Sequence, residues 1–434
     1  MGIGNVLRWL ATSTRRIVHQ TWNEIPELAH QTLRTQGGRA FLIFVVVYVL
    51  TTFYCAHTFK RDPTSAFFDP RYGYERIYSL KRQEQAEVFI AAARSNHSAV
   101  NTPQTPKLCV GISTIGRPGK QYVSYTIGSL LEGLTEQERA EIHLVTFIAQ
   151  TNPSLHPIYE EQWLEAVSDD VMLYNVSKET LGYLQGLERG RDYRVKGAHD
   201  YAYVLERCIE SKAPYIAILD DDTLAVAGWY PRAMAAVGRA EADTPQKQGP
   251  GWLYLRLFFT EEFLGWHSEL WHVYLRYSLA VSLGTGLALI ALRSCGWQSL
   301  ISDRILFVTC FVCVPACIGL YFLAGRLSLH PLKPGVYQMP RYGCCGQALL
   351  FPRDMAFVVL ARFRERGIGF PDALVEELAN EKGYMRWAVI PSLIQHIGSI
   401  SSKGDDFGAM AKHAVSVAEK IWSFGFEMYD ASKG

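Results

Sequence analysis

The apolar positions of the chain gather in three long runs. The first, A-F-L-I-F-V-V-V-Y-V-L-T-T-F-Y-C-A, covers residues 40–56, and the third covers residues 305–325. Each approaches the length of about 20 helical residues that spans a bilayer core. The second run, residues 277–292, is shorter, and we expect its helix to begin near Trp271, with Arg276 reaching toward the lipid headgroups. The pattern therefore predicts three membrane-spanning helices.

The second and third runs are joined by about a dozen residues, R-S-C-G-W-Q-S-L-I-S-D-R, which favours an antiparallel hairpin. A hydrophobic helix pair inside a soluble core is the alternative, but the lengths of the runs favour the membrane. The first run could be a cleaved signal peptide, yet no small-x-small site follows it, which favours an uncleaved anchor. Arginines outnumber acids before this run, so the N-terminus is expected in the cytoplasm.

Shorter apolar runs alternate with helical patterns in the remaining chain. Strands are predicted at residues 108–115, 142–149, 171–175 and 215–220, and helices at residues 122–134 and 198–211. This alternation is typical of an α/β fold with a mostly parallel sheet, in which ligands bind at the carboxyl ends of the strands. Thr114, Arg117 and the acids after residue 219 follow two such ends.

We expect seven segments along the chain. The stretch after the hairpin is too small for a sheet of its own, and two spans return the chain to the same side of the membrane, so this stretch is expected to complete the domain that the hairpin interrupts. The predicted segments are a cytosolic tail (1–39), a transmembrane anchor (40–58), a luminal stem (59–106), the first part of the α/β domain (107–268), the hairpin (269–326), the second part of the domain (327–405) and a helical tail (406–434).

Charge and cysteine content narrow the class of protein. Lys and Arg number 43 against 42 Asp and Glu, so nothing in the overall charge favours a nucleic-acid partner. The nine cysteines have no metal-finger spacing. Those of the soluble segments, Cys109, Cys208, Cys344 and Cys345, would lie in the lumen and could be oxidised, but their pairing cannot be read from the sequence.

The strongest chemical signal is the stretch Y-I-A-I-L-D-D-D-T, residues 215–223, in which a buried strand ends in three carboxylates. Asp220 and Asp222 are spaced to point at one divalent cation, and carboxylate oxygens suit Mn²⁺ or Mg²⁺ with a diphosphate and water in the remaining positions. A run of acids that caps the next helix is the alternative interpretation.

Four motifs together resemble the GT-A glycosyltransferases, and within them the N-acetylglucosaminyltransferase IV type. They are V-G-I-S-T-I-G-R, K-G-A-H-D-Y-A-Y, I-L-D-D-D-T and P-S-L-I-Q-H-I-G-S-I-S-S, and the resemblance covers residues 107–265 and 335–405. An anchor plus a hairpin inserted after the aspartates most resembles the Golgi N-acetylgalactosamine transferases that act on attached GPI anchors. The resemblance implies a GT-A (Rossmann-like) mixed sheet interrupted by a transmembrane hairpin. It also implies a luminal active site in the Golgi.

The resemblance implies a role for each matching position. Asp220, Asp222 and His396 would hold Mn²⁺ or Mg²⁺ on the diphosphate of a UDP-sugar. The residues expected around the nucleotide and donor sugar are Thr114, Arg117, Lys196, Asp200, Asp221 and Gly346. An inverting transferase also needs a carboxylate base, for which Asp372 is the first candidate and Glu376 the second. Either acid could instead belong to an ordinary charged helix start after a proline.

The function expected from this resemblance is transfer of N-acetylgalactosamine from UDP-GalNAc to a mannose of a GPI-anchored glycan or protein. The first of the three acids after residue 219 is Asp220, where the N-glycan enzymes have Glu. This difference leaves the expected fold unchanged but does not decide which sugar the donor carries. An N-acetylglucosaminyl- or galactosyltransferase acting on N-glycans or another lipid-linked glycan is therefore the nearest alternative. A non-catalytic membrane scaffold is the alternative from another class.

Overall fold

The computed structural model describes residues 35–95, 105–245, 249–339, 345–399, 419 and 421–429. The chain forms two compact units, each assembled from separate parts of the sequence: a membrane unit of residues 1–69 and 264–331, and a sheet unit of residues 70–263 and 332–434. Residues 1–34 of the predicted cytosolic tail and most of the predicted C-terminal tail lie outside the described residues.

The membrane unit contains three helices that are long and apolar enough to cross a bilayer, as the sequence predicted. The first is α2 (Gln36–Thr58), and the second, α11 (Trp271–Leu292), begins at the residue where the apolar run predicted it. The third combines α12 (Asp303–Val308), η5 (Thr309–Cys313) and α13 (Val314–Leu323). Its π-helical middle, η5, directly precedes the turn that contains Pro315, where the backbone lacks one donor.

Hydrogen bonds tie the chain after the anchor to the chain after the hairpin. Asp62 Oδ2 accepts from the backbone N–H and the hydroxyl of Ser328 at 2.8 and 2.6 Å, and Thr64 Oγ1 accepts from Leu327 N at 3.2 Å. Nearby, the Trp266 ring packs against Phe322 and its indole N–H donates to the Phe322 carbonyl. The anchor and the hairpin are thus parts of one unit rather than independent spans.

The sheet unit is built on one eight-stranded sheet in the order β3-β2-β1-β4-β8-β6-β9-β7. Four of its pairings are parallel and three are antiparallel, as expected for a mixed sheet: β8 runs antiparallel to β4 and β6, and β7 runs antiparallel to β9. The chain leaves the sheet after β6 and returns first in β7 and then in β8. Both strands run opposite to β6, so both begin at the end of the sheet where β6 finishes. The strands are β1 (Leu108–Thr114), β2 (Ile142–Ile148), β3 (Asp170–Met172), β4 (Tyr215–Asp220), β6 (Trp252–Arg256), β7 (Gly335–Gln338), β8 (Ala348–Pro352) and β9 (Met385–Ile390).

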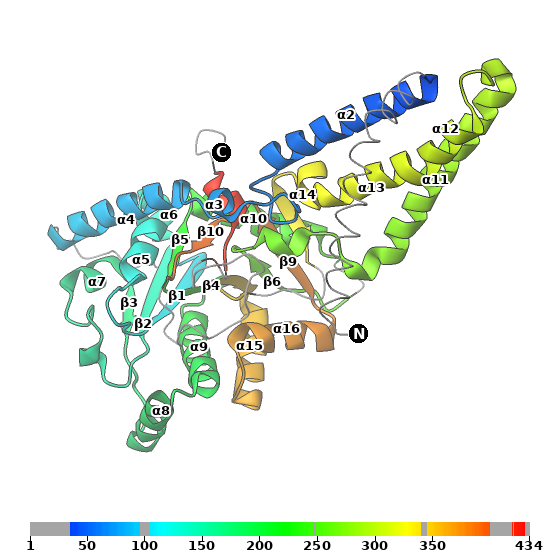
Figure 1. The fold of residues 1–434 in the computed structure, drawn as a ribbon. Coiled ribbons are helices and arrows are strands. Elements are labelled where there is room, and N and C mark those ends of the chain that lie inside the picture. Colours follow the sequence, from blue (N-terminus) through cyan, green and yellow to red (C-terminus); the bar gives the residue numbers. More distant parts are fainter. Residues whose placement is uncertain are drawn as a thin grey trace, which may run out of the picture. The chain divides into compact units, whose positions relative to one another are not determined.

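Helices cover both faces of this sheet (Figure 1). One face packs against α9 (Tyr193–Glu210), α15 (Arg353–Arg366) and α16 (Pro371–Lys382). The other packs against α4 (Tyr78–Ser95), α5 (Val123–Leu131) and α10 (Trp229–Asp243). The predicted mixed α/β fold with three apolar helices is confirmed.

The smaller elements belong partly to the sheet unit and partly to the membrane unit. A second, two-stranded sheet pairs β5 with β10. The remaining elements are α3 (Pro70–Gly73), α6 (Glu136–Ala140), η1 (Pro153–Leu155), α7 (Gln162–Val167), α8 (Lys178–Gly190), β5 (Thr223–Ala225), η2 (Glu261–Leu264), η3 (Ser268–Leu270), η4 (Arg293–Trp297), α14 (Arg326–Leu329), β10 (Ile394–His396) and α17 (Phe424–Glu427).

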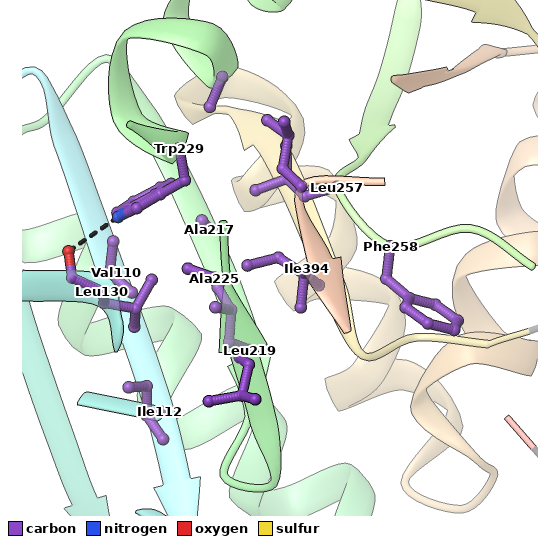
Figure 2. Packing of buried hydrophobic residues seen from close by; sticks show 14 of the residues in the cluster. Val110, Ile112, Leu130, Ala217, Leu219, Ala225, Trp229, Leu257, Phe258 and Ile394 are labelled. Atoms are coloured by element: carbon purple, nitrogen blue, oxygen red, sulfur yellow. Dashed lines mark hydrogen bonds between the residues drawn. The ribbon is translucent and has the colours of Figure 1, made fainter. Parts of the chain in front are cut away.

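The apolar side chains of β4 are packed in the core as far as Leu219, directly before the three acids. Figure 2 shows Ala217 of β4 beside Trp229, whose indole N–H donates to the Leu130 carbonyl at 2.8 Å, and Leu219 further along the strand at the level of Ile112. Trp229 is 1% exposed, so this hydrogen bond satisfies the polar atom of a fully buried ring. Apolar contacts thus hold β4 up to Leu219, and its three acids follow at the edge.

A disulfide joins Cys109 in β1 to Cys208 in α9, which resolves the pairing that the sequence left open for these two residues. Cys345 is also disulfide-bonded. The free cysteines that the structure describes all lie in the membrane unit, and they are Cys55, Cys295, Cys310, Cys313 and Cys317. Oxidised cysteines in the sheet unit are typical of a protein that folds in an oxidising compartment.

Arg82 connects α4 to α5 and β5 from a fully buried position. Its Nε donates to the Ala225 carbonyl at 2.9 Å, one terminal nitrogen donates to the Ser129 carbonyl at 2.8 Å, and the other binds Glu132. The hydrogen bonds to these partners offset part of the free-energy cost of burying the charge. Without Arg82, the same partners would be left unpaired.

We expect Arg82→Met to lower the free energy of unfolding by about 3 kcal/mol, because it leaves two buried carbonyls without a donor. The measurement is the apparent melting temperature of the detergent-solubilised protein. Lys81→Met is the matched control, because it removes the same charge from the exposed neighbouring position. Equal melting temperatures for the two variants would contradict this account.

Candidate active site

The three acids after β4 have different partners. Arg117 binds Asp221 through both terminal nitrogens, at 2.7 and 2.6 Å, and Thr114 Oγ1 donates to the same carboxylate at 2.6 Å. Arg117 and Asp221 are 8% and 4% exposed. Burial would lower the pKa of Arg117, but the carboxylates of Asp221 and Asp222 raise it. The middle acid is therefore neutralised within the chain.

His156 extends this contact and was missed by the sequence analysis. Thr114 donates its hydroxyl proton to Asp221, so His156 Nε2, 3.0 Å from Thr114 Oγ1, must be the donor. Its Nδ1 then accepts from the backbone N–H of Ile158 at 3.3 Å. Burial lowers the pKa of His156, which agrees with a neutral ring in this tautomer. No sequence pattern marks it, because it follows a short 3₁₀ turn far from the acids.

Asp222 meets His396 across the small sheet. In the pairing of β5 with β10, His396 lies opposite Thr223, and its Nε2 is 3.5 Å from Asp222 Oδ2. Burial alone would raise the pKa of Asp222, but His396 and Arg117 outweigh burial and hold this pKa at about 2. The structure thus brings together two of the three predicted metal ligands.

Gly398 makes this approach possible. A Cβ built on Gly398 would lie 2.2 Å from Asp222 Oδ2 and 2.9 Å from His396 Nε2. Any side chain at this position would displace both groups. The stretch Q-H-I-G-S was visible in the sequence, but the need for glycine there follows only from the fold.

The side chain of Asp220 points to the face of the main sheet that α9, α15 and α16 cover. Asp220 continues the alternation of Ile216 and Ile218, which pack against these helices. Within the part of the chain that the structure describes, no group of three or more His, Cys, Asp or Glu residues is placed to hold a metal ion. Asp222 and His396 supply one carboxylate and one imidazole. This pair fits a divalent cation whose other ligands come from a diphosphate and water.

Polar atoms without a partner in the described residues gather around Asp220. Ser113 lies opposite Asp220 in the β1–β4 register, and the Gln347 carbonyl accepts from the Asp220 N–H at 2.9 Å. Ser113 Oγ, Gln347 Oε1 and Tyr201 OH are all buried without a hydrogen-bond partner there. Burial raises the pKa of Tyr201, and the carboxylates of Asp220 and Asp372 raise it further, so both acids lie within electrostatic range of this hydroxyl.

The two candidate bases differ in their surroundings. Asp372 lies in the first turn of α16, where its Oδ1 accepts from the Ala373 N–H at 2.9 Å, and it approaches Gly346 so closely that a Cβ there would come within 3.1 Å. Glu376 is instead held by Arg256 and Arg386, each at 2.6 Å, and by the Tyr254 hydroxyl. Both oxygens of Glu376 are therefore occupied.

Lys196 and Asp200 form a buried group of their own. Lys196 Nζ donates to Asp200 Oδ2 at 2.9 Å, to the Ala149 carbonyl at 2.6 Å and to the Tyr174 hydroxyl at 3.0 Å. Burial raises the pKa of Asp200 despite the nearby ammonium group. This cluster fixes the first turns of α9 to the end of β2, one strand away from β1.

A model of the family described as GPI-N-acetylgalactosamine transferase PGAP4 matches residues 108–395. The match begins at the first residue of β1 and ends at Gln395 in β10, so it includes both parts of the sheet and the membrane hairpin between them. It covers more than half of the chain.

We expect Arg117→Met to lower the free energy of unfolding by about 3–5 kcal/mol, because it leaves the buried carboxylate of Asp221 without its cation. Adding Asp221→Asn should restore much of the loss, since the second change removes the uncompensated charge. The measurement is thermal unfolding of both variants and the wild type. A double variant no more stable than the single one would show that the ion pair does not stabilise the site.

Proposed function

Because the chain belongs to the GPI-N-acetylgalactosamine transferase PGAP4 family, we propose that it transfers N-acetylgalactosamine from UDP-N-acetylgalactosamine to a mannose of the GPI glycan, with inversion at the sugar carbon. The observation that carries this proposal is the approach of Asp222 to His396 at the end of β4, close to the buried, unpaired polar atoms of Ser113, Tyr201 and Gln347. The acceptor is a GPI-anchored glycan or protein.

Asp222 and His396 are the two residues proposed to hold Mn²⁺ or Mg²⁺. When bound, the cation neutralises the charge that develops on the leaving UDP. Asp222 is suited to this role because its pKa of about 2 keeps it ionised at every physiological pH. Asp220, whose side chain points to the layer of α9, α15 and α16, is proposed to contact the donor directly or through water.

The polar atoms around Asp220 are proposed to bind the donor sugar. A sugar ring with an acetamide group carries several hydrogen-bonding groups, and Ser113, Tyr201 and Gln347 each offer a buried polar atom. Tyr201 OH and Ser113 Oγ can each donate or accept, whereas Gln347 Oε1 can only accept. Leaving such atoms unpaired is costly, so a ligand that pairs with them gains both affinity and specificity.

Asp372 is the proposed base, because both oxygens of Glu376 already accept from arginines and a tyrosine. It would take the proton of the attacking mannose hydroxyl as that oxygen bonds to the anomeric carbon of the sugar. The bond from this carbon to the diphosphate breaks with its electron pair going to UDP. Gly346 allows Asp372 its position beside the donor sugar.

The nucleotide is proposed to lie along β1 and the start of α9. Arg117 Nε is buried without a partner in the described residues, so this side chain retains one donor beyond its contact with Asp221 and Asp222. Thr114 and Asp221 shape this cleft by fixing Arg117, and Lys196 with Asp200 form its more distant wall.

The membrane unit supports the assignment of the acceptor. Three helices apolar enough to span a bilayer would keep the enzyme in the membrane that also holds a lipid-anchored glycan, which raises the effective concentration of acceptor. We propose that this is the Golgi membrane, with the sheet unit in the lumen. The Cys109–Cys208 disulfide is compatible with that oxidising side.

The proposed activity is tested by sugar transfer from UDP-sugars to a mannose-containing GPI glycan by the full-length protein in detergent, with and without Mn²⁺. We expect transfer from UDP-N-acetylgalactosamine that requires the cation and is lost in Asp222→Ala. Transfer from UDP-N-acetylglucosamine or UDP-galactose instead would keep the enzyme class and change the donor. Absence of UDP binding by the wild type would favour a non-catalytic scaffold.

We expect Asp372→Asn to lower kcat by about 10²–10⁴-fold with little change in UDP affinity, because it removes the base and keeps the shape of the side chain. Glu376→Gln should instead lower thermal stability, since Arg256 and Arg386 would lose their shared carboxylate. Steady-state kinetics, UDP titration and melting curves separate the two effects. A base role for Glu376 would be indicated by the opposite assignment of these losses.

A further inference from the structure

The segment Ile421–Tyr429, here called the C-terminal segment, lies beyond the residues that the family model matches. It is nevertheless packed into the sheet unit: Phe426 is fully buried, and the rings of Phe426 and Tyr429 both contact Tyr78 of α4. One of its backbone atoms contacts His396.

That contact determines which nitrogen of His396 faces Asp222. The Ile421 carbonyl is 3.2 Å from His396 Nδ1, and a carbonyl can only accept, so Nδ1 carries the proton. A cation bound here would take the place of the proton on Nε2, so the lone pair of Nε2, which lies 3.5 Å from Asp222 Oδ2, would be directed toward it. A ligand histidine commonly has its other nitrogen fixed by a carbonyl in this way.

Gln395, next to His396 in β10, holds the C-terminal segment in register. Its side chain is fully buried; Oε1 accepts from Ser423 N at 2.9 Å, while Nε2 donates to Ser423 O at 2.9 Å and to Glu427 Oε1 at 3.0 Å. Neighbouring residues of a strand point to opposite faces. The C-terminal segment therefore contacts both faces of β10, with Ser423 bound on one and Ile421 on the other.

Glu261 adds a second attachment. Its carboxylate accepts from Phe424 N at 2.7 Å, from Gly425 N at 2.8 Å and from the Ser423 hydroxyl at 3.3 Å. At the other end of the C-terminal segment, the Tyr429 hydroxyl donates to the Ala227 carbonyl at 3.2 Å. Two buried polar side chains thus fix the residues directly after Ile421, and a separate contact holds the far end.

We propose that Gln395 is a positioning residue for the cation site: through Ser423 it holds the Ile421 carbonyl, which orients His396 with Nε2 toward the cation. This inference rests on the proposed function, because it assumes that Asp222 and His396 bind the divalent cation of a UDP-sugar transferase. It adds a role for Gln395 and for the C-terminal segment, neither of which would bind the cation directly.

The test compares Gln395→Met with Tyr429→Phe in the full-length protein in detergent, using Mn²⁺ in the presence of UDP. Methionine keeps the volume of the buried side chain and removes its four hydrogen bonds, three with the C-terminal segment and one that its Oε1 accepts from His396 N at 3.2 Å. Tyr429→Phe removes one hydrogen bond from the far end of the same segment. We expect Gln395→Met to weaken Mn²⁺ binding by about 10–100-fold and Tyr429→Phe to leave it within about twofold.

A spectroscopic signal distinguishes positioning from a loss of stability. The electron spin echo of bound Mn²⁺ should show nitrogen modulation from His396 in the wild type and in Tyr429→Phe, and this modulation should weaken in Gln395→Met and vanish in His396→Ala. If Gln395→Met does not fold, Glu261→Gln is the second variant. It should weaken Mn²⁺ binding several-fold, because its amide group can no longer accept from both Phe424 N and Gly425 N.

Wild-type Mn²⁺ affinity and nitrogen modulation in Gln395→Met, or in Glu261→Gln where the first variant does not fold, would overturn the positioning role and leave the proposed function intact. A wild-type protein that binds UDP but no Mn²⁺ would overturn both the cation site and this inference.

Discussion

The ion pair between Arg117 and Asp221 is the constraint on which the rest of the site depends. Three carboxylates in succession at the end of a buried strand repel one another, and removing Asp221 and Asp222 from water is costly. Arg117 binds the middle carboxylate through two nitrogens, with Thr114 as a further donor, so this charge is compensated within the protein. The outer two acids then lie in different surroundings: Asp222 is beside His396, and Asp220 is near the unpaired polar atoms of Ser113, Tyr201 and Gln347.

The antiparallel strand β8 gives the fold its second constraint. Because β7 and β8 both run opposite to β6, the chain can leave the sheet after β6, form two membrane helices and return at the same end of the sheet. The inserted helices need no place in the sheet, and the residues that follow them share hydrogen bonds with the chain after the N-terminal anchor. A soluble fold can thus carry a membrane hairpin without losing the strand order that brings Asp220 and Gln347 together.

Two neighbouring acids in α16 have different roles because the charged groups around them differ. Glu376 is one helical turn after Asp372, yet its carboxylate is surrounded by Arg256, Arg386 and Tyr254, whereas Asp372 lies at the helix start beside Gly346. An acid whose oxygens are all occupied stabilises the fold and is a poor acceptor for a further proton. The difference arises entirely from the strands β6 and β9, which supply the two arginines.

The sequence by itself determined the features that depend on local pattern: the three apolar helices, the start of α11 at Trp271, the α/β class, the acids at the end of β4 and the family to which the motifs belong. Long-range pairing decided the rest. Nothing local indicates that β8 is antiparallel, that Cys109 pairs with Cys208, that His156 supports Thr114, or that Gly398 must lack a side chain. These depend on residues that are distant in the chain and become neighbours only when the sheet forms. The same reason explains why Asp222 meets His396 while Asp220, two residues earlier, faces another helix layer.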